Sequence, residues 1–305
     1  MLDNETKQKM LIPMLDRAIE RLAEKIVDEF SDYDTTLQEF NKESSVIDLN
    51  DWNLYSLTID REKMFIMQNP GVGKKDESQI DEQRKRVIKW QEHKSSERLE
   101  TAIKSMQKGL IKWLTKYNMH FWKFFEILSK EKIIQHRIVN KSEYENYIKN
   151  HFLEDFYVTD LFKYRVPTTK LGSALYGKNV EKQEFRKKLM KVLEEYELKQ
   201  VKPKLVFVFS TRTWETFYTY FDKKIEPIGK ELEEDTRDFL KKVTNVHGLT
   251  FKLTIFGNEK EIIVIPLCHF SPRYYNNLIR SSYFRYFKER LVDNREIIQR
   301  YSASS

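Results

Sequence analysis

One stretch constrains the fold more than any other: the apolar run Phe65–Met67, which is followed by Gln68 and an Asn-Pro-Gly turn at residues 69–71. An apolar run bounded by Pro and Gly is typical of a buried strand. In open α/β sheets, ligands bind outside the carboxyl ends of such strands. The pattern therefore predicts a core strand that delivers Asn69 to the edge of a pocket.

Further apolar runs predict a sheet built around this strand. Leu205–Phe209 is the clearest buried strand, residues 156–163 form a second candidate, and residues 251–256 and 261–265 flank a Gly-Asn turn that is typical of a hairpin. Helical patterns separate these strands, at residues 5–31, 76–117 (in two pieces), 118–125, 141–152, 181–199, 231–245 and 280–300. Strands that alternate with helices predict a three-layer α/β/α fold with a small, mostly parallel sheet.

The chain of 305 residues is long enough for one large domain with additions. We expect residues 1–60 to be an N-terminal helical extension whose apolar stripe packs on the core. Residues 61–280 are expected to form the α/β domain, with a charged helical insertion at about 76–117. Residues 281–305 are expected to be a basic C-terminal helix and tail.

Charge and cysteine content narrow the function classes. A net charge of +7 and a pI of about 9.1 favour a polyanionic partner, with nucleic acid as the first expectation and a membrane surface as the second. No apolar run approaches the roughly 20 residues that span a bilayer, and the N-terminus has no signal-peptide pattern, so we expect a cytoplasmic protein. Of the two polyanionic partners we therefore retain nucleic acid and expect no membrane partner. The single cysteine, Cys268, excludes an internal disulfide and any cysteine-ligated zinc or iron–sulfur site.

Three segments are candidates for a phosphate contact. Gly71–Lys74 resembles a nucleotide-binding loop, but Gln68 occupies the place of the first Walker glycine and Lys75 replaces the required Ser or Thr, so no nucleotide cofactor is expected. The basic cluster at residues 84–89 fits a phosphate contact or, as we favour, a solvated face. Ser210 and Thr211 follow the Leu205–Phe209 strand and lead into a helix that opens with Trp214, where free backbone amides and hydroxyls suit an anion.

Taken together, four stretches resemble the uracil-DNA glycosylase superfamily, over roughly residues 60–280. Met67–Gly71 matches the Gly-x-Asn/Asp-Pro-Gly/Tyr motif with Met at its first position, and His269–Pro272 matches the His-Pro-Ser-Pro motif with Phe at its second. Asn118–Lys123 is similar to the Asn-x-Phe-Trp-Lys run of the mismatch-specific branch. Residues 156–167, with the helix and strand that follow them, are similar to the order in the iron–sulfur branch, whose cluster cysteines are absent here.

This resemblance implies a monofunctional DNA glycosylase that acts on an extruded nucleotide. Asn69 would orient the attacking water, and His269 would donate a hydrogen bond to the base oxygen as charge builds there. Base recognition would involve Gln68, with Phe121 either stacking on the base or packing in the core. DNA contacts would come from Ser210, Thr211, Ser271 and either Arg273 or Tyr274, the last two as candidates to fill the hole in the duplex. DNA is the expected partner, a monomer the expected state, and no metal or other cofactor is implied.

Asp160 departs from the family pattern, which generally carries an Asn that reads uracil at this place. A carboxylate offers only acceptors, so it suits the N4 amino group of cytosine and would repel uracil O4. Gly71 stands where the strictest uracil enzymes place a bulky Tyr, which would leave room for a C5 substituent such as those in some phage DNA. The hypothesis is a glycosylase for a modified cytosine that acts in antiviral defence. Uracil or mismatch repair and a non-catalytic nucleic-acid-binding module stay open as alternatives.

Overall fold

The computed structural model describes the chain in thirteen ranges, most of which belong to the α/β domain. They are residues 17–18, 21–22, 25, 55–67, 71–72, 96–117, 121–161, 166–167, 180–228, 251–255, 261–267, 283–293 and 295–296. The described part of the chain contains no helix with the length and apolar character needed to cross a membrane.

A mixed sheet forms the centre of the molecule, with the strand order β3-β1-β5-β8-β7-β6. The first four strands run parallel: β3 (Phe156–Asp160), β1 (Lys63–Met67), β5 (Leu205–Phe209) and β8 (Glu261–Leu267). β7 (Phe251–Thr254) and β6 (Ile225–Pro227) complete the sheet as antiparallel strands. The predicted parallel core and the β7–β8 hairpin are confirmed, whereas β6 was not predicted.

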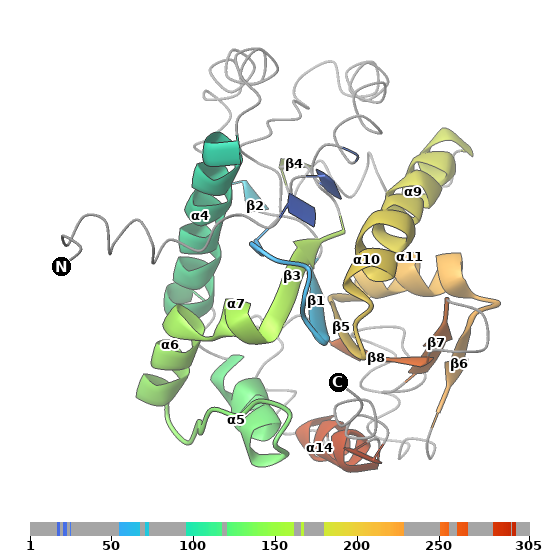
Figure 1. Cartoon of the computed structure of the whole chain (residues 1–305). Coiled ribbons are helices and arrows are strands. Elements are labelled where there is room, and N and C mark those ends of the chain that lie inside the picture. The colour runs from blue at the N-terminus through green and yellow to red at the C-terminus, as the bar shows by residue number, and fades with distance from the viewer. Residues whose placement is uncertain are drawn as a thin grey trace.

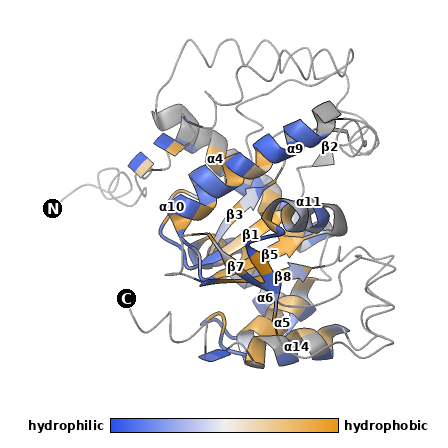
Figure 2. Cartoon of the chain, turned by 90° about the vertical axis from the view of Figure 1, so that its right-hand side faces the viewer, coloured by the Kyte–Doolittle hydropathy of each residue, from blue (hydrophilic) through white to orange (hydrophobic). Residues whose placement is uncertain are grey.

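Helices cover both faces of the sheet, which makes the fold a three-layer α/β/α arrangement (Figures 1 and 2). One layer contains α9 (Val180–Val192), which continues through the π-helical turn η5 (Leu193–Leu198) into α10 (Lys199–Val201), and α11 (Thr211–Phe221). The other contains α5 (Trp122–Lys130), α6 (Lys141–Asn150), α7 (Phe152–Asp155) and α14 (Tyr283–Asp293). Figure 1 shows α4 (Ser96–Lys112), which runs on into the π-helical turn η3 (Trp113–Tyr117), beyond the edge strand β3.

Alternation along the strands divides the core into two clusters, because successive strand side chains point to opposite faces. Met64 and Ile66 of β1 pack with the α9 and α11 layer. Phe65 lies on the other face, where it contacts the rings of Phe124 and Phe207 at centroid distances of 6.2 Å each. Burying a side chain of this size contributes roughly 1.5–3 kcal/mol, so Phe65 stabilises the packing of β1 against this layer.

A small second sheet joins the loops that follow β1 and β3. β2 (Gly71–Val72) pairs in parallel with β4 (Val166–Pro167), with Gly71 opposite Val166. Gly71, the last residue of the predicted Asn-Pro-Gly turn, therefore pairs with the segment after β3, whereas Asn69 and Pro70 lie outside the described residues. The two short strands follow β1 and β3 in the chain.

The helices agree with the sequence pattern where the structure describes them. Residues 96–117 of the expected insertion are helical, and the helix expected to open near Trp214 begins at Thr211. In the N-terminal segment, the described residues 17–18, 21–22 and 25 are helical and Leu22 is buried in the α9-side cluster. The expected helix at 231–245 and the basic cluster at 84–89 lie outside the described residues.

Candidate functional site

The four parallel strands end along one edge of the sheet. Met67 of β1 is in register with Asp160 of β3, and Phe209 of β5 is in register with Leu267 of β8. The backbone pairing continues one residue further, because Leu161 N donates to Met67 O at 2.8 Å and Ser210 N donates to Leu267 O at 2.9 Å. Ligands bind at such carboxyl edges in α/β sheets, so this edge is the candidate site.

Asp160 is the one carboxylate of the described strand ends at this edge, and it is only 1% exposed. The Tyr55 hydroxyl, itself buried, donates a hydrogen bond of 2.8 Å to Asp160 Oδ2. A buried carboxylate requires such donors, since removing it from water without them costs several kcal/mol. The hydroxyl therefore fixes the carboxylate in place at the end of β3.

The segment that carries Tyr55 is held against both β3 and α4. Ser56 Oγ accepts a hydrogen bond of 3.1 Å from Val158 N of β3, the edge strand of the sheet. Gln107 Nε2 of α4 donates to the Tyr55 carbonyl at 2.7 Å. These bonds connect the Asp160 carboxylate indirectly to α4, so the position of α4 and the position of Asp160 are linked.

A second buried carboxylate lies on the opposite face of β3. Glu197 of η5 is fully buried, and its Oε1 accepts from Thr159 Oγ1 at 2.6 Å and from Tyr157 OH at 3.0 Å. Burial, with the charge and the hydrogen bond of Glu197, holds the pKa of Tyr157 well above its usual value of 10. β3 is therefore fixed from both faces immediately before its end.

Ser210 joins β5 to α11 in a strained conformation. Its φ of 87° is positive, which costs a non-glycine residue about 1–3 kcal/mol. As N-cap of α11, its Oγ accepts from Thr213 N at 3.4 Å and lies 2.9 Å from Thr213 Oγ1. The helix that starts at Thr211 directs its N-terminus to the same edge, where its dipole favours an anion.

Phe121 is fully buried at the start of α5. Its ring centroid lies 5.1 Å from Phe209, 5.7 Å from Trp113 and 6.5 Å from Phe65. These contacts correspond to the packing role, one of the two that the sequence left open. A role in stacking on a base stays a prediction, because it needs a ring face open to the pocket.

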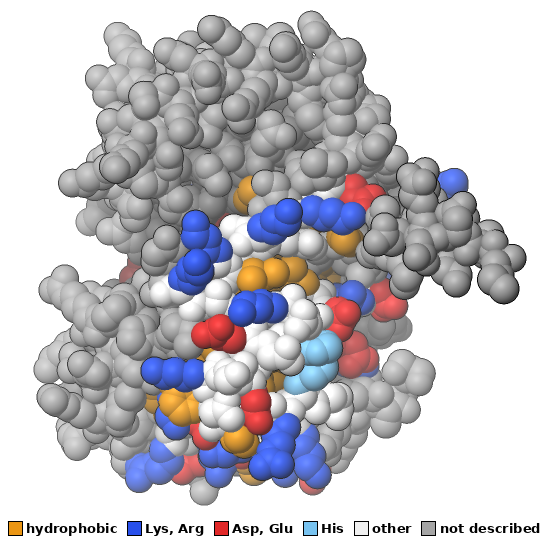
Figure 3. Space-filling model, turned by 90° about the vertical axis from the view of Figure 1, so that its left-hand side faces the viewer, with side chains coloured by type: hydrophobic (Ala, Val, Ile, Leu, Met, Phe, Trp, Pro, Cys, Tyr) orange, Lys and Arg blue, Asp and Glu red, His pale blue; other side chains and the backbone are white. Residues whose placement is uncertain are grey.

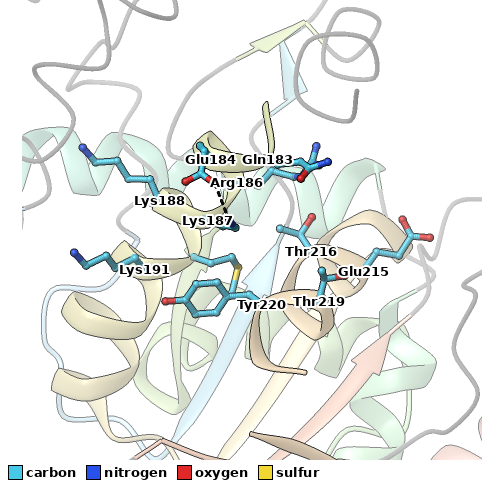
Figure 4. A pocket seen from close by; sticks show the side chains of 11 residues that line it. Gln183, Glu184, Arg186, Lys187, Lys188, Lys191, Glu215, Thr216, Thr219 and Tyr220 are labelled. Atoms are coloured by element: carbon cyan, nitrogen blue, oxygen red, sulfur yellow. Dashed lines mark hydrogen bonds and ion pairs between the residues drawn. The ribbon is translucent and has the colours of Figure 1, made fainter. Parts of the chain in front are cut away.

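A cavity of about 1010 Å³ lies between α9 and α11 (Figure 4). Its lining combines cations such as Arg186 and Lys187 with Glu184 and Glu215, and Lys187 Nζ pairs with Glu184 Oε1 at 2.7 Å. Thr216 and Tyr220 line the side formed by α11. Among the described residues, four cations and two carboxylates line the cavity, so the net charge of this lining is positive.

Several predicted site residues lie outside the described part of the chain: Gln68, Asn69, His269, Ser271, Arg273 and Tyr274. Of the others, Asp160 and Ser210 lie at the edge, Thr211 starts α11 there, and Gly71 pairs in β2. Sequence reasoning missed Tyr55 and Glu197 as partners of β3. Both are more than 35 residues from their partners in sequence, so no local spacing signals either contact.

Comparison with protein families identifies the family to which this fold and site belong. The family model described as the uracil DNA glycosylase superfamily matches residues 64–292, from β1 to α14. The chain belongs to the uracil-DNA glycosylase superfamily. A comparison with curated proteins found no match. The expected family and fold are therefore confirmed, and the superfamily assigns this chain general DNA glycosylase chemistry with DNA as the partner.

Proposed function

We propose that the protein is a monofunctional DNA glycosylase that releases a cytosine-type base, with a C5-substituted cytosine of phage DNA as its target. The observation that carries this proposal is the Asp160 carboxylate, buried at the end of β3 and hydrogen-bonded by the Tyr55 hydroxyl. It stands in register with Met67, the residue that precedes the Gln68–Asn69 motif.

The proposed reaction is hydrolysis of the bond between the sugar C1′ and the base nitrogen N1. As this bond breaks, positive charge develops on the sugar and negative charge on the base, while a water oxygen bonds to C1′. Asn69 positions the water, because attack on a nearly dissociated sugar depends more on positioning than on deprotonation. His269 donates a hydrogen bond to the base oxygen, the attacking water loses a proton to solvent, and the departing base takes up a proton from solvent.

Asp160 selects the base in this proposal. An ionised carboxylate only accepts hydrogen bonds, and the N4 amino group of cytosine is a donor where uracil presents the acceptor O4. The Tyr55 hydroxyl supports this selection, because a hydrogen bond donated to a carboxylate stabilises its ionised form. A site that leaves a buried acceptor facing another acceptor loses orders of magnitude in rate.

The rest of the proposal concerns the substituent, the DNA backbone and the setting. Gly71, opposite Val166 in the small sheet, is the position we assign to the space beside C5. Ser210, Thr211 and Ser271 bind phosphate, and Arg273 or Tyr274 fills the vacated place in the duplex. Such an enzyme acts as a cytoplasmic monomer in defence against phages whose DNA carries modified cytosine.

Base release from defined duplexes tests this function. The substrates carry uracil, a thymine mismatch, cytosine, 5-hydroxymethylcytosine or its glucosylated form at one position, and abasic sites are measured after cleavage with alkali. We expect release of a cytosine-type base, reduced by about 10²-fold or more in Asn69→Ala because the water loses its orienting group. Uracil release alone would assign the protein to repair, and no release from any duplex would favour a non-catalytic DNA-binding module.

A matched control separates the site from general effects of asparagine removal. Asn146 is exposed on α6, where its side-chain oxygen accepts from Asn150 Nδ2 at 2.8 Å. Asn146→Ala should leave base release unchanged within about twofold, because exposed substitutions away from a site have small effects. Equal losses in Asn69→Ala and Asn146→Ala would contradict the assignment of Asn69.

A further inference from the structure

The outer face of α4 and η3 carries a stripe of lysines. Lys104, Lys108, Lys112 and Lys116 occur at every fourth position, and the last three are exposed. The opposite side of the same helix is buried in the core through Ile103, Met106, Leu110 and Leu114. Figure 3 shows the face on which α4 and α6 lie, with Lys and Arg side chains distributed from its upper to its lower part.

The stripe has little internal charge compensation. Residues 101–117 contain no Asp or Glu, and Lys104 pairs with Glu100 at 2.6 Å, before the stripe begins. Within the described ranges, Lys108, Lys112 and Lys116 take part in no ion pair. Elsewhere lysines do pair along their helices, as in the exposed Lys149 with Glu145 of α6 and the half-buried Lys199 of α10 with Glu195 of η5.

Two features of this face work against helix stability. Like charges at i and i+4 repel each other, and a glycine within a helix is unfavourable relative to alanine. Gly109 lies among the lysines, and a Cβ atom added to it would meet no heavy atom within 4 Å. Core packing therefore gives no reason for the glycine, which leaves the helix backbone accessible beside Lys108 and Lys112.

We propose that the outer face of α4 and η3, from Lys104 to Lys116, binds the phosphate backbone of the DNA that flanks the target nucleotide. This inference rests on the family's DNA substrate and does not depend on which base is released. The stripe extends over about 18 Å at 1.5 Å per residue, a linear array of point charges suited to a linear polyanion. Gly109, between the lysines, offers no apolar side chain for insertion into a membrane.

The contact to Tyr55 places this stripe near the recognition site. Gln107, which precedes Lys108, donates from its side chain to the Tyr55 carbonyl, and Tyr55 in turn binds Asp160. DNA that presents a nucleotide to the end of β3 therefore has its flank within reach of α4. The stripe would increase affinity without reading sequence, because phosphate contacts carry no base information.

The salt dependence of DNA binding tests this surface. We measure the slope of log affinity for duplex DNA against log salt concentration. The triple-glutamine variant Lys108→Gln/Lys112→Gln/Lys116→Gln should have a shallower slope, by about 0.9 for each lost phosphate contact and about 2.7 for three. The control Lys149→Gln/Lys187→Gln/Lys199→Gln removes the same charge from ion-paired lysines and should change the slope by less than about 1. Equal changes in the two variants, or no change in the first, would overturn the proposal.

Substitutions at Gly109 change the charge of the stripe without lowering the stability of the fold. Open space and better helix propensity allow both Gly109→Lys and Gly109→Glu to fold, so both should keep the unaltered melting temperature or exceed it. Gly109→Lys should steepen the salt slope by about 0.9, and Gly109→Glu should weaken binding. Identical binding by the two would overturn the proposal, as would lysine-dependent binding of phosphatidylserine vesicles with an unchanged DNA slope.

The outcome is distinguishable from that of the proposed function. The control Lys149→Gln/Lys187→Gln/Lys199→Gln should release base at the unaltered rate, whereas the triple-glutamine variant should lose rate at low DNA concentration in proportion to its weaker DNA binding. If no duplex yields an abasic site, the proposed cytosine-type chemistry fails while the slope comparison still decides the role of the stripe.

Discussion

Two buried carboxylates on opposite faces of β3 are alike in chemistry and different in place. Glu197 accepts from the Tyr157 and Thr159 hydroxyls beneath η5, and Asp160 accepts from Tyr55 at the last residue of the strand. The first lies within a helix–sheet contact, and the second faces the edge where the parallel strands end. The comparison indicates that Glu197 fixes the strand within the core, whereas the role we propose for Asp160, held by the same kind of bond at the strand end, is to read the base.

Removal of the Asp160 carboxylate should have the largest effect. In Asp160→Ala, the rate of release of a cytosine-type base should fall by about 10³-fold, since the donor on the base loses its buried acceptor. The ratio of kcat/KM values for the variant and the unaltered protein measures this loss. A comparable loss in Glu197→Gln, at full folding, would break the distinction between the two carboxylates.

Removal of the Glu197 side chain should mainly reduce stability. Glu197→Ala leaves two buried hydroxyls without their acceptor and should lower the free energy of unfolding by about 3 kcal/mol. Urea denaturation measures this change, with Glu195→Ala on the same helical turn as a half-buried control expected to lose less than about 1 kcal/mol. Equal losses in both variants would contradict a specific role for Glu197.

The raised pKa of Tyr157 predicts a loss of stability at alkaline pH. Above pH 10 the unfolded chain ionises this tyrosine while the folded protein keeps it protonated, so the native state binds more protons. Stability is therefore complete below pH 10 and falls as pH rises, by about 1.4 kcal/mol per unit for this one group. Tyr157→Phe should reduce the slope by that amount, whereas an unchanged slope between pH 10 and 11 would exclude the effect.

Removal of the Tyr55 hydroxyl should have the smallest effect on stability. Tyr55→Phe loses one buried hydrogen bond to a carboxylate and should lower the unfolding free energy by about 1–2 kcal/mol. Its preference for cytosine-type bases over uracil should also weaken, because the ionised form of Asp160 loses a donor. Tyr218→Phe, on the exposed side of α11, serves as a control that should alter neither quantity.

The sequence predicted the sheet well because its signals are local. Leu205–Phe209 and Phe65–Met67 are continuous apolar runs with Pro, Gly or polar residues at their ends, and both form parallel core strands. β6 was missed, since Ile225–Pro227 is short and carries only one buried residue. Its place is set by pairing with β7, which no local pattern records.

Part of the candidate site was predictable, because local sequence patterns also indicate where strands end. Asp160 could be placed at a strand end from the run that precedes it, and Ser210 from the strand-to-helix transition. Tyr55 and Glu197 become partners of β3 only through tertiary packing, over 105 and 38 or more residues of chain. The lysine stripe is visible in the sequence, but its exposure depends on which side of α4 is buried.

The most direct test of the account is the base preference of Asp160→Asn. The variant keeps an acceptor for the Tyr55 hydroxyl and gains an amide donor, which uracil O4 can accept. The base preference should reverse on otherwise identical duplexes. The ratio of kcat/KM for the cytosine-type base to kcat/KM for uracil should fall by about 10²-fold or more. An unchanged ratio in folded Asp160→Asn would contradict the proposal that this carboxylate reads the base.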